Sequence, residues 1–386
     1  MEISDDIVYV GVNDHEIDLF EGQYTVPRGM AYNSYFINDA KTAVMDTVDS
    51  RFGGEWLKNV ESASGGKSPD YLVIHHMEPD HSACIAMALE KWSGTTVVAS
   101  AQAFRFMEQF FGEAIAPKRL VVKEGDALEL GRHRLAFVAA PMVHWPEVLM
   151  TYVPEQKVLF SADAFGKFGV YDADADDWAC EARRYYFNIC GKYGRPVANV
   201  LKAASSLDIQ TIAPLHGPIL EGEKMQEAVR LYTIWSSYEP ETDGVLVAYA
   251  SIHGNTRKAA LQLAEVLRAK GSKVAVTDLS RDDMAEAIED AFRMSRMVLC
   301  CSTYDADIFP PMHNFLHKLQ LKTYQSRRVG LVENGSWAPQ AARIMRSMLE
   351  QLKDITIVDP VVSIRSTLKP TDVPALEALA EHLLQD

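Results

Sequence analysis

The chain has 386 residues, of which 48% are hydrophobic and 24% are charged, and its formal net charge at pH 7 is −15. This length exceeds the usual limit for a single hydrophobic core, so two domains are expected. The acidic balance argues against nucleic acid and against an anionic membrane as partners.

The amino terminus and the apolar segments predict a cytoplasmic protein. The first six residues are acidic and have neither the basic nor the apolar region of a signal peptide. No apolar run approaches the roughly 20 residues that cross a bilayer. The five cysteines form no C-x-x-C pair, which argues against a zinc ribbon, a rubredoxin module and a disulfide framework.

The first part of the chain mixes short strands with helices, without a strict alternation of the two. The expected strands are rich in Val, Tyr, Phe and Ile and are bounded by Gly, Asp and Asn. They are Ile7–Val12, Ala31–Ile37, Thr42–Asp46, Tyr71–His75, Thr96–Ala99, Arg134–Ala139, Val148–Val153 and Lys157–Ser161. The expected helices are Trp56–Ser62, Ser82–Lys91, Ala103–Phe111 and Asp177–Gly191. We therefore expect an α+β domain over residues 1–240.

A polar segment with Pro240 and Gly244, spanning Ser236–Gly244, is typical of a linker. After it five strands alternate with five helices, which predicts an α/β domain over residues 244–386, built on a doubly wound parallel sheet. The expected strands are Val245–Ala250, Lys273–Asp278, Met297–Ser302, Arg328–Glu333 and Ile355–Val361. The expected helices are Arg257–Ala269, Asp283–Phe292, Pro311–Leu319, Ala338–Leu352 and Val373–Gln385.

The most informative stretch of the first domain is Ile74-His75-His76-Met77-Glu78-Pro79-Asp80-His81. A strand is expected to end at His75 and a helix to begin near Ser82, so the residues between them form a loop. Alternate residues His76 and Glu78 can point to one side of this loop, while Asp80 and His81 point to another. The loop can therefore supply ligands to two metal ions; a polar loop with a helix-capping aspartate is the plainer alternative.

Three more candidate ligands follow expected strands of the same domain. His144 lies in P-M-V-H-W-P, Asp163 in S-A-D-A-F-G and His216 in A-P-L-H-G-P. A lone histidine after a strand is usually structural, but three such residues beside an H-x-E-x-D-H run indicate one shared metal site. The candidate ligands are four imidazoles and three carboxylates: His76, Glu78, Asp80, His81, His144, Asp163 and His216.

This layout resembles that of the metallo-β-lactamase family, in which the first motif is H-x-H-x-D-H and zinc is bound. Here Glu78 takes the place of the second histidine. Carboxylates are harder ligands than imidazoles and stabilise the higher oxidation states of iron. The replacement therefore favours two iron ions over zinc, and Asp163 is the expected bridge by its place in the pattern.

The second domain carries a candidate phosphate-binding loop, Ser251-Ile252-His253-Gly254-Asn255-Thr256, between an expected strand and an expected helix. At such a position free backbone N–H groups and the helix dipole face an anion. The loop has no Walker lysine, which argues against a nucleoside triphosphate, and G-x-G-x-x-G is absent, which argues against a dinucleotide. FMN fits the loop; an ordinary capped turn is the alternative.

Two further loops follow the third and fourth expected strands of this domain, Ser302-Thr303-Tyr304-Asp305 and Asn334-Gly335-Ser336-Trp337. In the sheet order 2-1-3-4-5, ligands bind at the carboxyl ends of the strands beside the switch point. Trp337, together with Tyr304, is a candidate for stacking on the isoalloxazine ring; a core position is the alternative for Trp337. The three loops together predict an FMN site.

The chain resembles the flavodiiron proteins (A-type flavoproteins) over nearly its whole length. The resemblance lies in the order of the motifs: H-x-E-x-D-H, a later histidine, S-A-D-A-F-G, H-G-P, S-x-x-G-N-T and E-N-G-S-W. It implies an N-terminal metallo-β-lactamase-like αββα sandwich and a C-terminal flavodoxin-like domain with the sheet order 2-1-3-4-5. It also implies that one iron is held by His76, Glu78 and His144, the other by Asp80, His81 and His216, with Asp163 as the bridge.

The resemblance further implies an oxidoreductase that passes electrons from FMN to two non-heme iron ions, which reduce dioxygen to water, nitric oxide to nitrous oxide, or both. It implies a head-to-tail homodimer and an external electron donor such as rubredoxin or a flavin or NADH reductase. Tyr185 or Tyr186 is a candidate hydrogen-bond donor near the irons, with helix packing as the alternative. One departure from the family is Ser302, where a proline usually precedes the threonine.

Two other functions fit part of the pattern. A dizinc hydrolase with a flavodoxin tail would act on a thioester, a lactam or a phosphodiester, but Glu78 and the flavin domain count against it. An electron-carrier flavoprotein could have lost the metal of its first domain, but the complete set of seven ligands counts against that loss.

Overall fold

The structure is a computed structural model of the chain, and it describes residues 2–171 and 178–385. It divides into two compact units, one of Met1–Tyr186 with Arg195–Thr233 and the other of Phe187–Gly194 with Ile234–Asp386. We call these the first and second units. Among the described residues, no helix is both long enough and apolar enough to cross a membrane.

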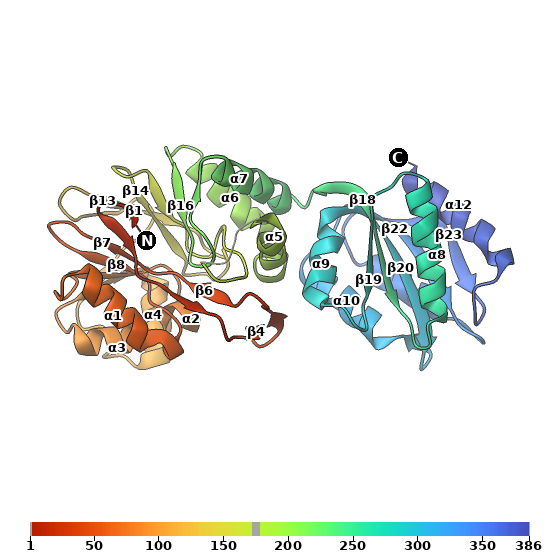
Figure 1. Cartoon of the computed structure of the whole chain (residues 1–386), viewed down its shortest axis with the longest axis horizontal. Helices are drawn as coiled ribbons and strands as arrows, with labels where there is room; N and C mark the ends of the chain where they lie inside the picture. Colours follow the sequence, from red (N-terminus) through yellow and green to blue (C-terminus); the bar gives the residue numbers. More distant parts are fainter. Residues whose placement is uncertain (1, 172–177, 386) are drawn as a thin grey trace. The chain divides into compact units, whose positions relative to one another are not determined.

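The first unit is built on two sheets (Figure 1), with strand orders β1-β2-β7-β8-β9-β10-β11 and β12-β13-β14-β15-β16-β17. The strands of the first sheet are β1 Glu2–Ser4, β2 Ile7–Tyr9, β7 Tyr35–Ile37, β8 Ala43–Met45, β9 Tyr71–Ile74, β10 Thr96–Ala99 and β11 Arg119–Val121. Those of the second are β12 Ala127–Glu129, β13 Arg134–Ala139, β14 Leu149–Val153, β15 Val158–Phe160, β16 Thr211–Ala213 and β17 Leu220–Glu221. Two short ladders pair β3 Val12–Asp14 with β6 Met30–Tyr32, and β4 Leu19–Phe20 with β5 Tyr24–Thr25.

The core of this unit lies between the two sheets. Met45 and Val73 of the first sheet share one cluster of buried side chains with Phe137, Val153 and Phe160 of the second. Helices cover the outer faces of both sheets (Figure 1), which gives the αββα sandwich. They are α1 Gly53–Ala63, α3 Ile85–Lys91 and α4 Ala101–Phe111 at the first sheet, and α6 Gly194–Ala204 and α7 Gly222–Ser236 at the second.

The second unit is a flavodoxin-like domain whose parallel strands run in the order β19-β18-β20-β22-β23, which is the expected order 2-1-3-4-5. The strands are β18 Thr242–Ala250, β19 Val274–Asp278, β20 Met294–Tyr304, β22 Arg327–Asn334 and β23 Ile355–Ile364, with the short β21 Asp307–Ile308 beside β20. The helices α8 Asn255–Ala269 and α12 Val373–Leu384 pack together on one face of the sheet (Figure 1). The helices α9 Met284–Arg293 and α10 Pro310–Leu321 lie on the other face, where α11 Ala341–Leu349 contacts α10.

Local sequence explains several of these boundaries. The central strand β18 is apolar and buried from Val245 to its end, as expected for a strand covered on both faces. The side chain of Asp283 caps α9 by accepting a hydrogen bond from the Ala285 amide at 2.6 Å. α10 begins at Pro310, which has no N–H to leave unpaired in the first turn.

Some elements differ from the expectations. The loop expected before Ser82 contains a one-turn helix, α2 Pro79–Ser82, so Asp80 and His81 lie on a helix and α3 starts only at Ile85. A proline at the first position favours this early start.

Further differences lie near the ends of the expected elements. The expected linker is shorter, because α7 continues to Ser236 and β18 starts at Thr242. α11 starts at Ala341 rather than Ala338. Ala338 precedes Pro339, and the helical conformation is disfavoured for a residue that precedes a proline. Asp177, the first residue of one expected helix, lies outside the described residues, and α5 runs from Trp178 to Ile189.

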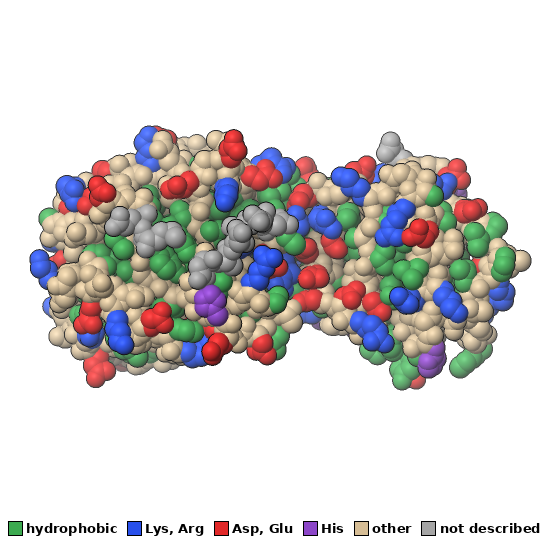
Figure 2. Space-filling model, viewed as in Figure 1, with side chains coloured by type: hydrophobic (Ala, Val, Ile, Leu, Met, Phe, Trp, Pro, Cys, Tyr) green, Lys and Arg blue, Asp and Glu red, His purple; other side chains and the backbone are tan. Residues whose placement is uncertain are grey.

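The molecular surface carries both signs of charge. On the face drawn in Figure 2, acidic and basic side chains are interspersed and no broad basic area stands out. This pattern agrees with the net charge of −15.

Candidate metal centre and flavin pocket

The loops that follow four strands of the first unit bring the seven candidate metal ligands together. β9 leads into His76, Glu78 and the helix α2, which carries Asp80 and His81. The loops after β13, β15 and β16 carry His144, Asp163 and His216. The site is therefore built from both sheets of the sandwich, with ligands that lie far apart in the sequence.

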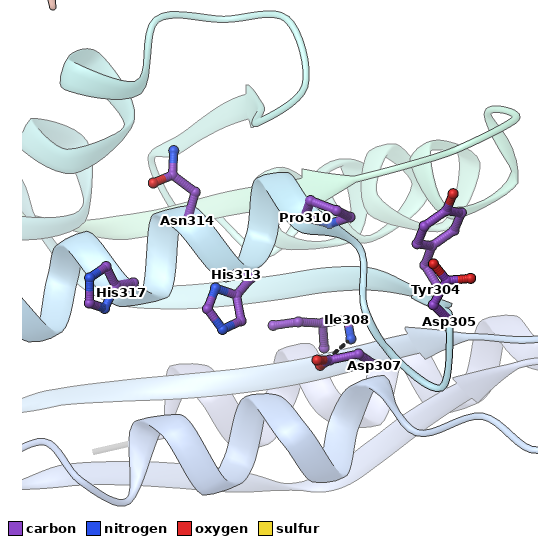
Figure 3. A pocket seen from close by; sticks show the side chains of 8 residues that line it. All are labelled: Tyr304, Asp305, Asp307, Ile308, Pro310, His313, Asn314 and His317. Atoms are coloured by element: carbon purple, nitrogen blue, oxygen red, sulfur yellow. Dashed lines mark hydrogen bonds between the residues drawn. The ribbon is translucent and has the colours of Figure 1, made fainter.

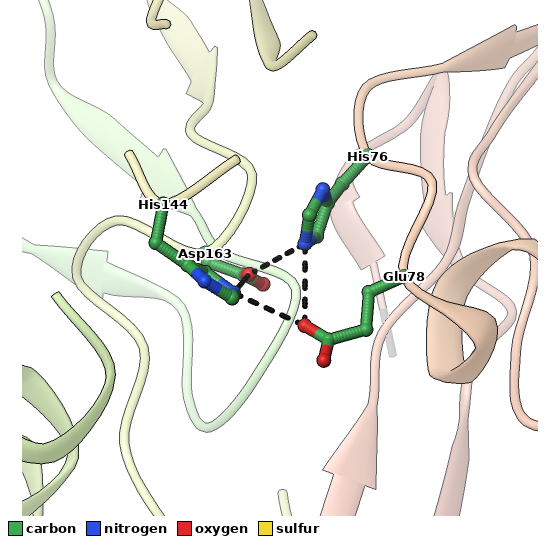
Figure 4. A group of neighbouring side chains, drawn as sticks. All are labelled: His76, Glu78, His144 and Asp163. Carbon is green, nitrogen blue, oxygen red and sulfur yellow. Dashed lines mark hydrogen bonds and ion pairs between the residues drawn. The ribbon is translucent and has the colours of Figure 1, made fainter. Parts of the chain in front are cut away.

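His76, Glu78, His144 and Asp163 form the first group (Figure 4), and their ligand atoms all lie within 4.8 Å of one another. Nε2 of His144 is 3.1 Å from Oε2 of Glu78 and 3.1 Å from Oδ2 of Asp163. Nε2 of His76 is 3.3 Å and 3.2 Å from the same two oxygens. Two imidazole nitrogens and two carboxylate oxygens thus face a common point, which is a ligand set suited to a divalent transition metal.

Asp80, His81 and His216 form the second group, also within 4.8 Å of one another. The Nε2 atoms of the two histidines are 3.0 Å apart, and Oδ2 of Asp80 lies 3.2 Å from His81 and 3.3 Å from His216. Oδ1 of Asp163 is 3.4 Å and 3.7 Å from the same two nitrogens. Asp163 therefore presents one oxygen to each group, as a bridging carboxylate would.

Unpaired polar atoms provide a test of whether metal ions fit this site. Both carboxylate oxygens of Asp80 and of Asp163, and Nδ1 of His81, are buried and have no hydrogen-bond partner among the described residues. Buried acceptors without partners are rare because each costs free energy. Cations between the two groups would satisfy these oxygens, so the residues present fit two metal ions.

The pKa shifts of Glu78 and His144 also indicate that the site favours positive charge. Desolvation raises the pKa of Glu78, but His144 and His76 outweigh it and bring the pKa down to about 2. Desolvation lowers the pKa of His144, but Asp163 and Glu78 raise it to about 9. Without a metal, a protonated His144 supplies part of the positive charge that the buried carboxylates require.

Aromatic rings surround the two groups of ligands. The ring of Trp145 lies 5.2 Å from that of His76, and the ring of Phe20 lies 5.4 Å from that of His216. Of the two predicted tyrosines, Tyr185 lies against the site, with its ring 5.6 Å from His216. Tyr186 is buried too, but its ring packs on Tyr232 at 5.0 Å. Phe20 and Trp145 were not predicted from the sequence, although Trp145 directly follows a candidate ligand.

Glu147 is a third residue near the site that was not predicted from the sequence. Its carboxylate is buried, and Oε1 accepts hydrogen bonds from Nδ1 of His76 and from the amide of Met77, both at 2.8 Å. The available signal was its place in H-W-P-E, three residues after His144 and next to a strand.

The loops of the second unit that were predicted to bind FMN line one pocket of about 850 Å³. All the predicted residues lie at its wall except Gly254: Ser251, Ile252, His253, Asn255, Thr256, Ser302, Thr303, Tyr304, Asp305, Asn334, Gly335, Ser336 and Trp337. Residues that the sequence analysis did not name also line it: Ala306, Ala338, Gln340, Arg343 and Ser366. The volume lies in the range of small-molecule sites.

The first loop has the geometry of an anion cradle. Gly254, with φ of +83°, is the N-cap of α8, and its left-handed conformation turns the chain into the helix. The first amides of α8 have no partner within the helix and are available to a phosphate. Oγ of Ser251 accepts the Gly254 amide at 3.1 Å, which shapes the turn.

The loops that begin at Ser302 and at Asn334 form another part of the pocket wall. The Thr303 hydroxyl oxygen accepts the amides of Gln340 and Ala341, at 2.9 and 3.2 Å, at the start of α11. Ser302, where the family usually has proline, lies 2.7 Å from Thr256 through the two hydroxyl oxygens. Trp337 is 83% exposed at the rim, so the core alternative for this residue is wrong.

A smaller cavity of about 370 Å³ adjoins the second loop (Figure 3), with Tyr304 and Asp305 in both walls. His313 and His317 lie one turn apart on α10 in this cavity. Within residues 2–171 and 178–385, groups of three or more metal-ligating side chains converge only in the two places described in the first unit. The histidine pair is therefore not part of a third metal group.

Comparison with known proteins gives two family models and several relatives that align over most of this chain. The model described as ODP family beta lactamase matches residues 30–217, and the flavodoxin model matches residues 247–372. An uncharacterised protein of Methanocaldococcus jannaschii is 30% identical, over 82% of this chain and 80% of the relative. The anaerobic nitric oxide reductase flavorubredoxin of Aliivibrio fischeri is 29% identical, over 99% of this chain and 78% of the relative.

Solved structures with the same architecture extend over both units. The rubredoxin oxygen:oxidoreductase of Desulfovibrio gigas has a TM-score of 0.92 at 26% identity, covering 99% of this chain and 97% of that chain. The flavodiiron protein of Giardia intestinalis has a TM-score of 0.91 at 24% identity, covering 99% and 95%, and this likeness concerns the fold alone.

Proposed function

The chain belongs to the flavodiiron protein family, and we propose that it passes electrons from FMN to two iron ions, at which dioxygen is reduced to water, nitric oxide to nitrous oxide, or both. The observation that carries this proposal is the pair of ligand groups that share Asp163, in a chain whose second unit has the flavodoxin sheet order.

Two metal positions are proposed. His76, Glu78 and His144 would hold one iron, Asp80, His81 and His216 the other, and Asp163 both. Each position then has at least one carboxylate of its own besides the shared one, which suits iron better than zinc. The oxygens of Asp80 and Asp163, which lack hydrogen-bond partners among the described residues, support this assignment.

FMN is proposed for the pocket of the second unit. Its phosphate would bind the amides at the start of α8, beside Ser251 and Thr256. Its ring would lie near the exposed rings of Tyr304 and Trp337. Arg343 adds a positive charge to the same wall.

The electron count matches the two reactions. When bound, two ferrous ions supply one electron each and reduced FMN supplies two, which is four in all. Reduction of dioxygen to water requires four electrons, and reduction of two nitric oxide molecules to nitrous oxide requires two. The protein's own part is to hold the ligands rigidly and to exclude water with the rings of Phe20, Trp145 and Tyr185. Exclusion of water strengthens the electrostatic interactions in the site.

We propose two kinds of partner, a second copy of the chain and an external electron donor. Ile252, Tyr304 and Trp337, all at the flavin pocket, are among the exposed large hydrophobic side chains of the described residues. A head-to-tail homodimer, in which each flavin unit meets the partner's iron unit, would cover this apolar rim. An external donor such as rubredoxin or a flavin or NADH reductase would supply electrons, in the cytosol.

Metal and flavin analysis of the purified protein tests this function. We expect two irons and one FMN per chain, with turnover of dioxygen or nitric oxide by the reduced protein. Two zincs with hydrolase activity, or a flavin without any metal, would contradict it. Turnover rates measured separately with dioxygen and with nitric oxide then show which gas is preferred.

A further inference from the structure

Glu147 lies behind the imidazole of one proposed ligand only. Its Oε1 atom accepts Nδ1–H of His76 and the Met77 amide, both at 2.8 Å, and its side chain is 0% exposed. Because a carboxylate can only accept hydrogen bonds, Nδ1 of His76 carries a hydrogen. Nε2 then faces Glu78 and Asp163 as the metal-binding atom.

The other three proposed histidine ligands lack such a partner. His216 donates through Nδ1 to the neutral backbone carbonyl of Ala31 at 2.7 Å. Nδ1 of His81 is buried without a hydrogen-bond partner among the described residues. His144 contacts Glu78 and Asp163 through Nε2, and no hydrogen bond to its Nδ1 is formed within the same described part of the chain.

The two positions therefore differ in charge. Each has one carboxylate of its own, Glu78 or Asp80, and one oxygen of the shared Asp163. Among the described residues, only the position of His76 has a further carboxylate, Glu147, that accepts a hydrogen bond from the imidazole of a proposed ligand. A carboxylate behind a ligating imidazole fixes its orientation and increases its basicity, and a nearby negative charge in a buried site favours the more positive ion.

We propose that Glu147 is a positioning residue that makes the two metal positions unequal, so that the position of His76, Glu78 and His144 is the harder one to reduce. The position of Asp80, His81 and His216 then takes the first electron delivered by the flavin. This inference rests on the proposed two-iron site and adds an order of reduction to it.

The structure offers a matched control for the substitution. Oδ2 of Asp39 accepts Nδ1 and the backbone amide of His133, at 2.8 and 2.7 Å, and both side chains are 2% exposed. This pair repeats the contacts of Glu147 with an imidazole that is not among the seven proposed ligands. Asp39, unlike Glu147, also lies 3.6 Å from Nε of Arg132. Asp39→Asn removes a carboxylate charge from the same kind of contact with an imidazole, without acting on a ligand.

The first test is cobalt(II) binding to the full chain, freed of metal by a chelator. In Glu147→Gln we expect one of the two positions to bind about 10- to 100-fold more weakly and the other to keep its affinity. Glu147→Asp, which keeps the charge, should restore most of the loss, and Asp39→Asn should bind like the wild type. Equal weakening at both positions, or no change in Glu147→Gln, would overturn the proposal.

The second test is a reductive titration of the iron-loaded protein followed by EPR. In the wild type we expect two separate one-electron steps, and in Glu147→Gln the lower potential should rise toward the higher. A tenfold change in the preference for the oxidised ion corresponds to about 59 mV for one electron. If both steps move equally, or neither moves, the proposal is wrong. A wild type that binds two cobalt ions unequally but shows no gas reduction would instead contradict only the proposed function.

Discussion

Asp163 connects the two groups of proposed ligands, because its oxygens point to different sets of histidines. Oδ2 lies 3.1 Å from His144, and Oδ1 lies 3.4 Å from His81. Its side chain is 1% exposed, and both oxygens lack a hydrogen-bond partner among the described residues. No other of the seven residues contacts both groups through a carboxylate in this way.

Asp163→Ala is therefore expected to lower the affinity of both metal positions, by at least about 100-fold, which is the upper end of what loss of a contact around a ligand costs. Gas reduction should be lost with the metal, while flavin absorbance should stay as in the wild type. Metal analysis and an absorption spectrum of the same sample measure both. Full oxidase activity in a metal-free Asp163→Ala protein would exclude the two-iron assignment.

The histidines of the metal-free protein predict a pH dependence of metal binding. Desolvation lowers the pKa of His144, but Asp163 and Glu78 raise it to about 9, so this imidazole is protonated at pH 7 and must lose its proton to bind a metal. Affinity should therefore increase from pH 6 toward pH 9. Zinc titrations in weak buffer with a pH indicator should detect proton release at pH 7. Binding without any proton release at pH 7 would contradict the prediction.

At the scale of elements, the site depends on where strands end and helices begin. The ligands were predictable because each follows an apolar strand in a motif, and the flavin loops because they follow β18, β20 and β22. The one-turn helix α2 was not predicted, since four residues are too few for a helical pattern. Glu147 was missed because its role depends on the contact with His76, which lies 71 residues away in the sequence.

The helices α6 and α7 were not predicted either. Both pack on the outer face of the second sheet (Figure 1), and no helix or strand range was predicted between residues 192 and 235. By contrast, the parallel sheet of the second unit was predicted from the alternation of strands and helices, and its strand order from the resemblance to the flavodiiron proteins.

The phosphate loop allows a prediction at this scale. Thr256→Asp places a negative charge in the first turn of α8, at the proposed FMN phosphate. Like charges at roughly 4 Å repel by about 4 kcal/mol at an effective dielectric constant of 20, so FMN affinity should decrease at least about 100-fold. Thr256→Ser keeps the hydroxyl that contacts Ser302 at 2.7 Å and should bind FMN normally. Iron content should be equal in both variants, and retention of FMN by Thr256→Asp would contradict the loop assignment.

At the scale of the whole molecule, the proposed cofactors lie in separate units of the chain. Electrons move efficiently only over short distances, and a two-fold dimer would bring each flavin to the partner's irons. The exposed rings of Tyr304 and Trp337 are 43% and 83% accessible in one chain, and such a contact would bury them.

Mixing two inactive variants tests this assembly. Asp163→Ala chains lack the proposed irons and Thr256→Asp chains lack the proposed FMN, but a mixed dimer contains one complete pair of cofactors. Mixed samples, after dissociation and reassembly, should recover up to about a quarter of the wild-type activity, because half of the dimers are mixed and each has one working pair. Sedimentation that finds a fully active monomer at the assay concentration would contradict the dimer.

The transfer of electrons from FMN to two irons is tested most directly by the stoichiometry of one oxidation. The protein is reduced anaerobically with dithionite, the electrons taken up per chain are counted, and the reduced protein is then mixed with limiting dioxygen. We predict four electrons per chain, one dioxygen consumed by each fully reduced chain, and water as the product without hydrogen peroxide. Uptake of only two electrons, with hydrogen peroxide as the product in both the wild type and Asp163→Ala, would show that the flavin alone reacts and would contradict the account.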